Sequence, residues 1–530
     1  MSKIAQYLNE HILGEATTDP VELKQHATDA SILSITPEIV AYPRQTNDIR
    51  KITRFTYQLA SKGHAMSVIA RGGGTDRTGA SIGKGIIVNT TKHMNHIFEF
   101  DSKQKLVRLQ PGVTFSALNE ALQLQGCHVP TQPDGAQYST IGGAIANNCS
   151  GYLSGKNGAM DEFVEELEVV LSNGDVIQTG KLSKGQLSKK KALQTLEGEI
   201  YRTIDGLIED NKALIQNLYE ASDIDNSGYR TIAQVKKRNG TFNLTPLFVG
   251  SQGTLGIVSE IIMRTEYYSG EETMLAIMAE SDQQLHDLMD IVRKFQPDYA
   301  EVYNAQLFEQ AKTHGKKYAL YENASAGDKN CAGIIVCGYT DFNDHARKKK
   351  LKKIQKALNK VNMRYVAADS VELIDEMSAL RGSVMMASQP SSRDSSAPSL
   401  FTGVYIPHER FEDCMKALSQ LAAEHKITLP YTGHVLDGVY AFWPQFALRS
   451  VGGKQKMLKL YGEFVKVIEA YSGSVVAESG EGRLKRPFTQ QDDDLDNLYA
   501  KIRETFDPYK TLNGGIKEPV DLKSIVSHLK

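Results

Sequence analysis

Residues 71–79 read Arg-Gly-Gly-Gly-Thr-Asp-Arg-Thr-Gly, a glycine-rich turn between two short apolar runs. The run before it (67–70) and the run after it (85–89) are rich in β-branched residues and have the length of strands. The turn does not open a helix and lacks Gly-Lys-Ser/Thr, so it fits neither a Rossmann loop nor a P-loop. Consecutive glycines still let backbone N–H groups approach an anion. Taken alone, the turn predicts a pyrophosphate site or an ordinary glycine-rich turn with equal weight.

Two further stretches have the same character. Residues 133–151 read Pro-Asp-Gly-Ala-Gln-Tyr-Ser-Thr-Ile-Gly-Gly-Ala-Ile-Ala-Asn-Asn-Cys-Ser-Gly, and residues 247–258 read Leu-Phe-Val-Gly-Ser-Gln-Gly-Thr-Leu-Gly-Ile-Val. A backbone with few side chains can lie against a large planar ligand and hydrogen-bond its edge. Each stretch alone could also be a turn-rich pair of buried strands. Three such stretches in this order predict one shared binding site.

In these stretches the chain resembles the FAD-binding core of the vanillyl-alcohol-oxidase/PCMH flavoprotein superfamily. The matching motifs are Arg-Gly-Gly-Gly-Thr (71–75), Thr-Ile-Gly-Gly-x-Ile-Ala-Asn-Asn (140–148) and Gly-Ser-x-Gly-Thr-Leu-Gly-Ile (250–257). Phe-Asp-Pro at 506–508 and Gly-Ile-Lys at 515–517 extend the resemblance to nearly the whole chain. The branch it is most similar to is that of the FAD-linked D-lactate and D-2-hydroxyglutarate dehydrogenases.

The resemblance implies bound FAD. Some covalent relatives carry a flavin-linking histidine where this chain has Thr75, so we expect the FAD to be non-covalent. The residues expected to bind it are Arg71, Gly72, Gly73, Gly74, Thr75, Gly79, Pro133, Asp134, Thr140, Gly142, Gly143, Ala146, Asn147, Asn148, Gly151, Gly253, Thr254, Gly256, Ile257, Val258 and Asn513.

The resemblance also implies an α+β fold. We expect a PCMH-type FAD-binding domain of two α+β subdomains (1–266) and an α+β substrate, or cap, domain with an antiparallel sheet (267–457). A helical C-terminal segment (458–530) is expected to return to the flavin. The pattern from residue 267 agrees, because two strand–helix pairs of similar size predict a sheet with helices on one face.

Composition narrows the function classes. The chain has 530 residues, 61 basic and 63 acidic, for a net charge of −2, which gives no global signal for nucleic acid. Five cysteines form no Cys-x-x-Cys pair, which favours a reducing compartment and excludes a conventional cysteine-ligated iron–sulfur cluster within this chain. The N-terminus has no long apolar stretch, and no run of about 18 apolar residues occurs. We therefore expect a cytoplasmic protein.

One basic run stands out against this neutral background. Residues 347–353 read Arg-Lys-Lys-Lys-Leu-Lys-Lys, and apolar residues follow at helical spacing. Two interpretations are open: a solvated helix face, or peripheral contact with the anionic inner face of a membrane. The electron acceptor is likewise open between a quinone, a separate Fe–S protein and a flavin partner.

The residues expected to act on substrate depart from the family pattern. The resemblance places the carboxylate-binding arginine at Arg381, whose planar fork matches a carboxylate, with Arg483 as the alternative anchor. The family's metal site uses two histidines and a Glu-His pair, of which this chain keeps His434 and Glu478. The other two positions are taken by Ala441 and Ser479.

One histidine and one glutamate are too few for a tight transition-metal site, so we expect no bound metal. Asp437 or Glu481 as substitute ligands remain open. His434 is then the best base, because its unperturbed pKa lies near neutrality. The plainer alternatives are a surface role for Arg381 and a structural role for His434.

These features predict an FAD-dependent dehydrogenase that oxidises a 2-hydroxy acid, such as D-lactate or D-2-hydroxyglutarate, by hydride transfer to flavin. Two alternatives remain: a flavin-dependent oxidase of another alcohol, and an FAD-binding subunit with a degenerate substrate site.

Overall fold

The computed structural model describes residues 2–133, 135–221, 223–389, 395–489 and 492–530. The chain forms two compact units. The first unit contains Met1–Ser150, Ala159–Tyr267 and Glu478–Lys530, and the second contains Gly151–Gly158 and Tyr268–Ala477. The expected domain boundaries at 266 and 457 stay predictions, although by internal contacts helix α18 (Val451–Ala470) falls within the second unit.

The first unit begins with a sheet in the order β1-β2-β4-β3. Its strands are β1 (Glu15–Thr17), β2 (Ile39–Tyr42), β3 (Val68–Arg71) and β4 (Ile86–Asn89). Strands β2, β4 and β3 are parallel, and every residue of β2 and β4 is buried. A parallel sheet covered on both faces requires such continuous apolar runs, which explains the β-branched residues around the glycine-rich turn.

A second, antiparallel sheet of the first unit has the order β5-β6-β10-β8-β9. Its strands are β5 (Ile97–Asp101), β6 (Leu106–Leu109), β8 (Val164–Val170), β9 (Val176–Gln178) and β10 (Ile257–Arg264). Burial alternates strictly along β10, as expected for a sheet with one face toward a core. The third glycine-rich stretch leads directly into β10, so this sheet holds that stretch in place. The two α+β subdomains that the resemblance implied are therefore confirmed.

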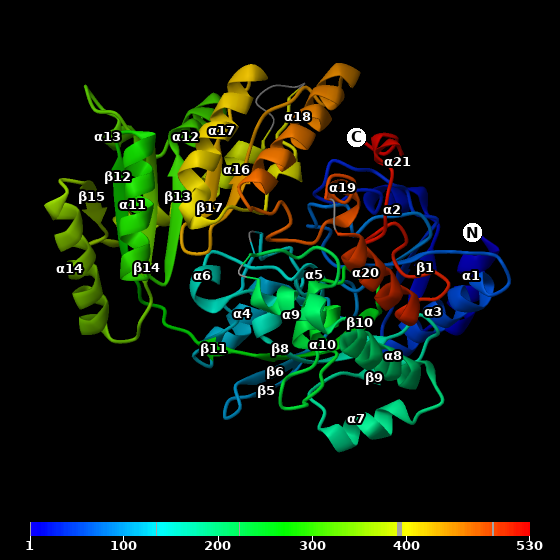
Figure 1. Cartoon of the computed structure of the whole chain (residues 1–530). Helices are drawn as coiled ribbons and strands as arrows, with labels where there is room; N and C mark the ends of the chain where they lie inside the picture. Colours follow the sequence, from blue (N-terminus) through cyan, green and yellow to red (C-terminus); the bar gives the residue numbers. More distant parts are fainter. Residues whose placement is uncertain (1, 134, 222, 390–394, 490–491) are drawn as a thin grey trace. The chain divides into compact units, whose positions relative to one another are not determined.

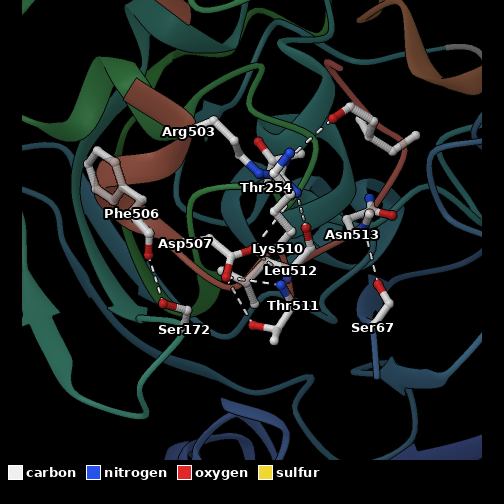
Figure 2. Close-up of polar contacts among 12 residues, drawn as sticks. Ser67, Ser172, Thr254, Arg503, Phe506, Asp507, Lys510, Thr511, Leu512 and Asn513 are labelled. Carbon is white, nitrogen blue, oxygen red and sulfur yellow. Dashed lines mark hydrogen bonds and ion pairs between the residues drawn. The ribbon is translucent and has the colours of Figure 1, made fainter. Parts of the chain in front are cut away.

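The segment Glu478–Lys530 completes the first unit by extending the edge of the first sheet (Figure 2). Val68 N donates to Thr511 O (2.7 Å), and Asn513 N donates to Val68 O (2.9 Å). Asp507, fully buried, accepts from Thr511 N (3.0 Å) and Leu512 N (2.7 Å) and fixes the turn after α20 (Asp493–Phe506). The C-terminal segment thus lies beside β3, the strand that leads into the glycine-rich turn.

Helices complete the first unit. They are α1 (Lys3–His11), α2 (Pro20–Gln25), α3 (Thr46–Ala60), α4 (Phe115–Gln123), α5 (Ile141–Asn147), α7 (Lys184–Lys191), α8 (Leu196–Asp210), α9 (Lys212–Glu220), α10 (Thr245–Phe248), α19 (Gly482–Lys485), α20 and α21 (Leu522–Val526).

The second unit is built on an antiparallel sheet in the order β15-β12-β14-β13-β17-β18-β16 (Figure 1). Its strands are β12 (Thr273–Ala279), β13 (Tyr299–Asn304), β14 (Gly333–Tyr339), β15 (Arg364–Ala367), β16 (Val404–Tyr405), β17 (Tyr431–His434) and β18 (Val439–Phe442). The sequence predicted β12, β14 and the two helices that follow them, α11 (Asp282–Phe295) and α14 (Asp344–Lys360).

The expectation of helices on one face of this sheet is wrong. Helices α11 and α14 contact β12 and β14, as one layer. Met274, Ala276 and Met278 of β12 instead pack with residues of α12 (Ala305–Thr313), α13 (Ala319–Ala324) and α15 (Val371–Ala379). Because consecutive strand residues point to opposite faces, the unbroken apolar run of β12 reflects cover on both faces.

The remaining helices of the second unit are α6 (Ser154–Asn157), α16 (Ser383–Ser388), α17 (Phe411–Glu424) and α18. Within the described part of the chain, no helix combines the length and apolar character needed to cross a membrane.

Candidate functional site

The glycine-rich turn connects the parallel strands β3 and β4 without an intervening helix, as the sequence predicted. Gly74 (φ +72°) and Gly79 (φ +79°) adopt left-handed conformations that other residues rarely take. A Cβ at Gly73 would lie 1.9 Å from the carbonyl oxygen of Tyr138, and a Cβ at Gly72 would lie 2.0 Å from Thr140 Oγ1. A side chain at either position would collide with the second stretch, so both positions require glycine.

The second stretch contains the short helix α5. Thr140 Oγ1 accepts from Gly143 N (3.3 Å) at its start, and Asn148 ends it at φ +50°. Thr75 Oγ1 lies 3.1 Å from Ser139 Oγ, a second contact with the glycine-rich turn. The third stretch attaches by backbone hydrogen bonds, from Gly250 N to Ile145 O and from Gln252 N to Ala146 O, both 2.8 Å. The three stretches that the sequence placed in one site are thus in direct contact.

Gln252 joins all three stretches to the C-terminal segment. Its Nε2 donates to Asn147 Oδ1 (2.9 Å) and Thr78 Oγ1 (3.2 Å), and its Oε1 accepts from Gly482 N (3.0 Å). The side chain is buried. Sequence reasoning missed this residue, because it occupies the variable position of the Gly-Ser-x-Gly motif and its partners are far away in sequence.

Asp76 is the second residue that sequence reasoning missed. Its carboxylate accepts from Thr78 N (3.0 Å), Ala80 N (2.7 Å) and Asn147 Nδ2 (2.8 Å). An aspartate that bonds the amide two residues later forms an Asx turn, so the spacing Asp-x-Thr was the available signal. Together with Gln252, Asp76 fixes both ends of the Asn147 carboxamide.

The first two stretches, together with Ser81, Glu478 and Ser479, line a cavity of about 80 Å³ within the first unit. Its lining is Gly72, Gly73, Gly74, Thr75, Asp76, Arg77, Ser81, Pro133, Ser139, Thr140, Gly143, Ala144, Asn147, Cys149, Glu478 and Ser479. Eight of the expected cofactor residues are therefore brought together, and Glu478 with them. Typical ligand pockets hold roughly 300–1,000 Å³, so this cavity corresponds to one part of a dinucleotide.

Two other expected cofactor residues lie outside the lining and donate to backbone carbonyl groups of the first unit. Arg71 is buried beneath the turn and donates to Thr28 O (2.9 Å) and Ser81 O (3.3 Å). Asn513 donates to Ala80 O (2.8 Å) and Gln252 O (2.7 Å).

The rest of that set does not line the cavity either. Thr254 is bonded to Tyr229 and Ser251, and Ile257 and Val258 pair with β8. Gly79, Gly142, Ala146, Asn148, Gly253 and Gly256 also lie outside the lining. Gly151 belongs to the second unit, and Asp134 lies outside the described residues.

Arg483, the expected alternative anchor for a substrate carboxylate, is held by groups of the first unit. All three nitrogens of its guanidinium donate there, to Ile82 O (3.1 Å), Gly514 O (2.7 Å) and Asn513 Oδ1 (3.3 Å). Burial lowers the pKa of Arg483 to about 10. These hydrogen bonds give Arg483 a structural role, and its role as an anchor stays a prediction.

Arg381 of the second unit has a different environment. Its Nε donates to Glu301 Oε2 (2.6 Å), and its guanidinium carbon lies 3.9 Å from the ring centroid of Tyr152. Burial acts to lower the pKa of Arg381, but Glu301 and three neighbouring tyrosines outweigh it and raise the pKa well above its usual value. Its Nη2 is buried and has no hydrogen-bond partner within the described residues. Sequence reasoning missed Glu301.

His434 lies next to this pair, because it is the cross-strand partner of Glu301 between β17 and β13. Its Nδ1 is 3.4 Å from Ser154 Oγ and 3.8 Å from Asp437 Oδ2. Ser154 also donates to Asp437. Tyr152 and Ser154 both come from Gly151–Gly158, the short segment that the chain contributes to the second unit directly after the second glycine-rich stretch.

The histidine and glutamate kept from the family's metal site are distributed over both units, His434 in the second and Glu478 in the first. Across the described residues, no three side chains of His, Cys, Asp or Glu gather closely enough to hold a metal ion. The expectation of no bound metal stays a prediction.

Comparison with known proteins identifies the class. Residues 37–180 match the FAD binding domain family, and residues 271–516 match the C-terminal domain of FAD linked oxidases. The chain therefore carries an FAD binding domain followed by the C-terminal domain of FAD linked oxidases, and it binds FAD.

Its relatives are distant. D-2-hydroxyglutarate dehydrogenase of Pantoea ananatis is 24% identical over 95% of this chain and 50% of its own length. Glycolate oxidase subunit GlcD of Bacillus subtilis is 26% identical over 90% of this chain and 88% of its own. The chain thus spans about half the length of the first relative. The structure of p-cresol methylhydroxylase with substrate bound has the same fold, with a TM-score of 0.68 and 12% identity over 98% and 96% of the two chains.

The residues of the cavity fit FAD. Gly72, Gly73 and Gly74 line one part of it, which suits close approach to a pyrophosphate, and Arg77 places a positive charge among the carboxylates of Asp76 and Glu478. Burial raises the pKa of the Cys149 thiol, so this cysteine stays protonated and is a poor nucleophile. With Thr75 unable to form a histidyl link, non-covalent binding is the expectation that follows.

Gln252→Ala tests how the cavity is held together. The change leaves Asn147 Oδ1 and Gly482 N without their partner, and a buried unsatisfied group costs about 1–3 kcal/mol. We expect a lower free energy of unfolding and less FAD retained after gel filtration, measured by thermal unfolding and the flavin-to-protein absorbance ratio. The control is Gln234→Ala, which removes an exposed glutamine of the same unit. Unchanged stability and flavin content in Gln252→Ala would contradict the proposed link.

Asp29 gives the first unit a pH dependence. It accepts from Ser31 N (3.0 Å) and from Ser81 Oγ (3.1 Å), and Ser81 lines the cavity. Burial, reinforced by repulsion from Asp76, raises the pKa of Asp29 from 3.8 to about 6. Between these two values the folded protein binds more protons than the unfolded chain, so the contribution of Asp29 to stability falls as pH rises through this window.

Asp29→Asn mimics the protonated carboxyl. We expect it to raise the melting temperature relative to the wild type at about pH 7.5, with a smaller gain at about pH 5. Thermal unfolding at the two pH values measures the difference. Asp210→Asn, at an exposed position of α8, should show no such pH-dependent gain. An equal effect of Asp29→Asn at both pH values would show that its charge is not the cause.

Proposed function

We propose that this protein is an FAD-dependent dehydrogenase that oxidises a 2-hydroxy acid such as D-lactate or D-2-hydroxyglutarate. The observation that carries the proposal is Arg381 Nη2, which is buried and has no hydrogen-bond partner among the described residues. Glu301 holds this guanidinium beside His434. A guanidinium with a fixed edge and a neighbouring imidazole are the two groups that a 2-hydroxy acid needs from the protein. Relatives named for D-2-hydroxyglutarate and D-lactate support the substrate class.

Bound FAD would supply the hydride acceptor. In the first unit, the glycine-rich turn and the α5 stretch would hold the pyrophosphate part by backbone N–H groups. In the second unit, Arg381 Nη2 would donate to the substrate carboxylate while Glu301 fixes the orientation of the guanidinium. His434 would take the hydroxyl proton, and the carboxylate of Asp437, 3.8 Å away, would stabilise the resulting imidazolium.

The proposal assigns no metal to this step. His434 and Asp437 form a donor pair in the second unit, and a closed transition-metal site needs more such ligands. Ala441 and Ser479 replace the imidazoles that family members use.

These same replacements favour a second candidate, an FAD-binding subunit whose own substrate site is degenerate. One relative is named as a subunit of glycolate oxidase, and this chain spans 88% of its length. Such a subunit would exchange electrons with a separate redox partner, because its own site would take none from a substrate.

Anaerobic mixing with single 2-hydroxy acids separates the two candidates. The dehydrogenase should lose its oxidised-flavin absorbance with one of these acids: a single enantiomer of lactate or of 2-hydroxyglutarate, or the achiral glycolate. A chain that binds FAD and is reduced by dithionite but by none of these acids would support the subunit.

Variants of Arg381 test the carboxylate anchor. A charge-assisted bond contributes roughly 1.5–3 kcal/mol, so Arg381→Ala should weaken apparent substrate affinity by about tenfold to a few hundredfold. Arg381→Lys keeps the positive charge but loses the forked guanidinium, so its substrate affinity should lie between those of the wild type and Arg381→Ala. Flavin bleaching against substrate concentration measures the affinity, and FAD content should not change.

The matched control is Arg410→Ala, an exposed arginine of the same unit, which should bind substrate like the wild type. Identical affinities of wild type and Arg381→Ala would remove the carboxylate anchor from the proposal.

A further inference from the structure

Helix α14 carries the most concentrated charge of the second unit. It contains seven lysines, all exposed, together with Arg347 and a single carboxylate, Asp344. The whole chain has a net charge of −2, so this helix is a local exception and not part of a basic protein. Lysines at this density repel one another unless a counter-charge lies nearby.

Little of this charge is neutralised within the described residues. Lys348 pairs with Asp344 (2.8 Å) and Lys350 with Asp341 (3.4 Å), both exposed pairs. The other five, Lys349, Lys352, Lys353, Lys356 and Lys360, form no ion pair with any described residue. Helix α11 packs beside α14 and carries exposed aspartates, but no ion pair joins them to these lysines in the described part of the chain.

The other lysine run of the chain makes the contrast clear. On α7, Lys190 pairs with Glu197 (2.5 Å) and Lys191 with Asp205 (2.6 Å). Carboxylates of the first unit thus neutralise two lysines of that run, as expected for an ordinary surface helix. Most lysines of α14 have no such ion pair among the described residues, so a solvated helix face explains α7 better than α14.

The helix is also fixed in its orientation. Arg347 is buried and bonded to Glu271 Oε2 (2.6 Å), and Ile354 and Leu358 are buried on the same side. The lysines therefore project from the opposite side as one surface. Apolar side chains are exposed just outside both ends of the helix, with Phe342 62% exposed before it and Val361 46% exposed after it.

We propose that α14 binds an anionic phospholipid surface. Clusters of four to eight basic residues on one helix are attracted to anionic lipid. The flanking Phe342 and Val361 match the boundary between headgroups and acyl chains, where exposed apolar side chains add to such attraction. An acidic protein would match the lysines but give no use to the apolar flanks.

Sedimentation of the full-length, FAD-loaded protein with vesicles tests this proposal. Binding is expected to vesicles of equal parts phosphatidylcholine and phosphatidylglycerol, to be absent with phosphatidylcholine alone, and to weaken in high salt. Each lysine near the surface contributes about fivefold, so replacing Lys349, Lys353 and Lys356 by Gln should weaken binding on the order of a hundredfold. The matched control replaces Lys189, Lys190 and Lys191 of α7 by Gln, which changes the net charge equally and should leave binding unchanged.

Phe342→Ala should lower the salt concentration that releases the protein. Equal losses in the α14 and α7 variants would overturn the proposal, because net charge and not this surface would then be responsible. Binding to poly-glutamate without binding to the anionic vesicles would also overturn it and assign the surface to an acidic protein. Neither outcome depends on flavin reduction, so the substrate proposal stands or falls separately.

Discussion

The carbonyl oxygen of Tyr138 lies where a side chain at Gly73 would have to be, 1.9 Å from that Cβ position. Because Gly73 has no side chain, the first two glycine-rich stretches can approach each other this closely. The third stretch then closes on α5 through two backbone hydrogen bonds, and Gln252 ties all of them to Gly482. Further along the chain, Asp507 turns the C-terminal segment back along β3 (Figure 2), and Asn513 there donates to Gln252 O (2.7 Å). The position of the FAD cavity thus depends on close backbone packing, while side chains such as Thr75, Asn147 and Glu478 complete its lining.

The sequence predicted the parts of this arrangement that are local. Runs of glycine and small residues identified the three stretches, and β-branched runs identified their flanking strands. Roles that depend on distant partners were not predictable in the same way. Arg483 was expected at the substrate and Asn513 at the cofactor, yet their side chains bond backbone groups of the first unit. Gln252 and Glu301 carry no local pattern, since their partners stand many residues away along the chain.

In the second unit, too, local features were predictable from the sequence and contacts with distant residues were not. The sequence located β12, β14 and the helices that follow them, α11 and α14, but the continuous apolar run of β12 was misread as part of a sheet covered on one face. The candidate substrate residues His434 and Arg381 were found by resemblance, whereas their connection through Glu301 comes from strand pairing between β13 and β17. The segment Gly151–Gly158 adds Tyr152 and Ser154 to this cluster. The chain therefore contributes two side chains to the candidate substrate residues of the second unit directly after the second glycine-rich stretch.

Identification of the flavin extracted from the purified protein tests this description of the cavity most directly. Acid or heat should release one intact FAD per chain, since non-covalent binding of a dinucleotide is what the three stretches imply. Release of FMN would contradict the pyrophosphate role of the glycine-rich turn. A flavin that remains attached to the chain after denaturation would contradict the non-covalent binding inferred from Thr75 and the protonated Cys149.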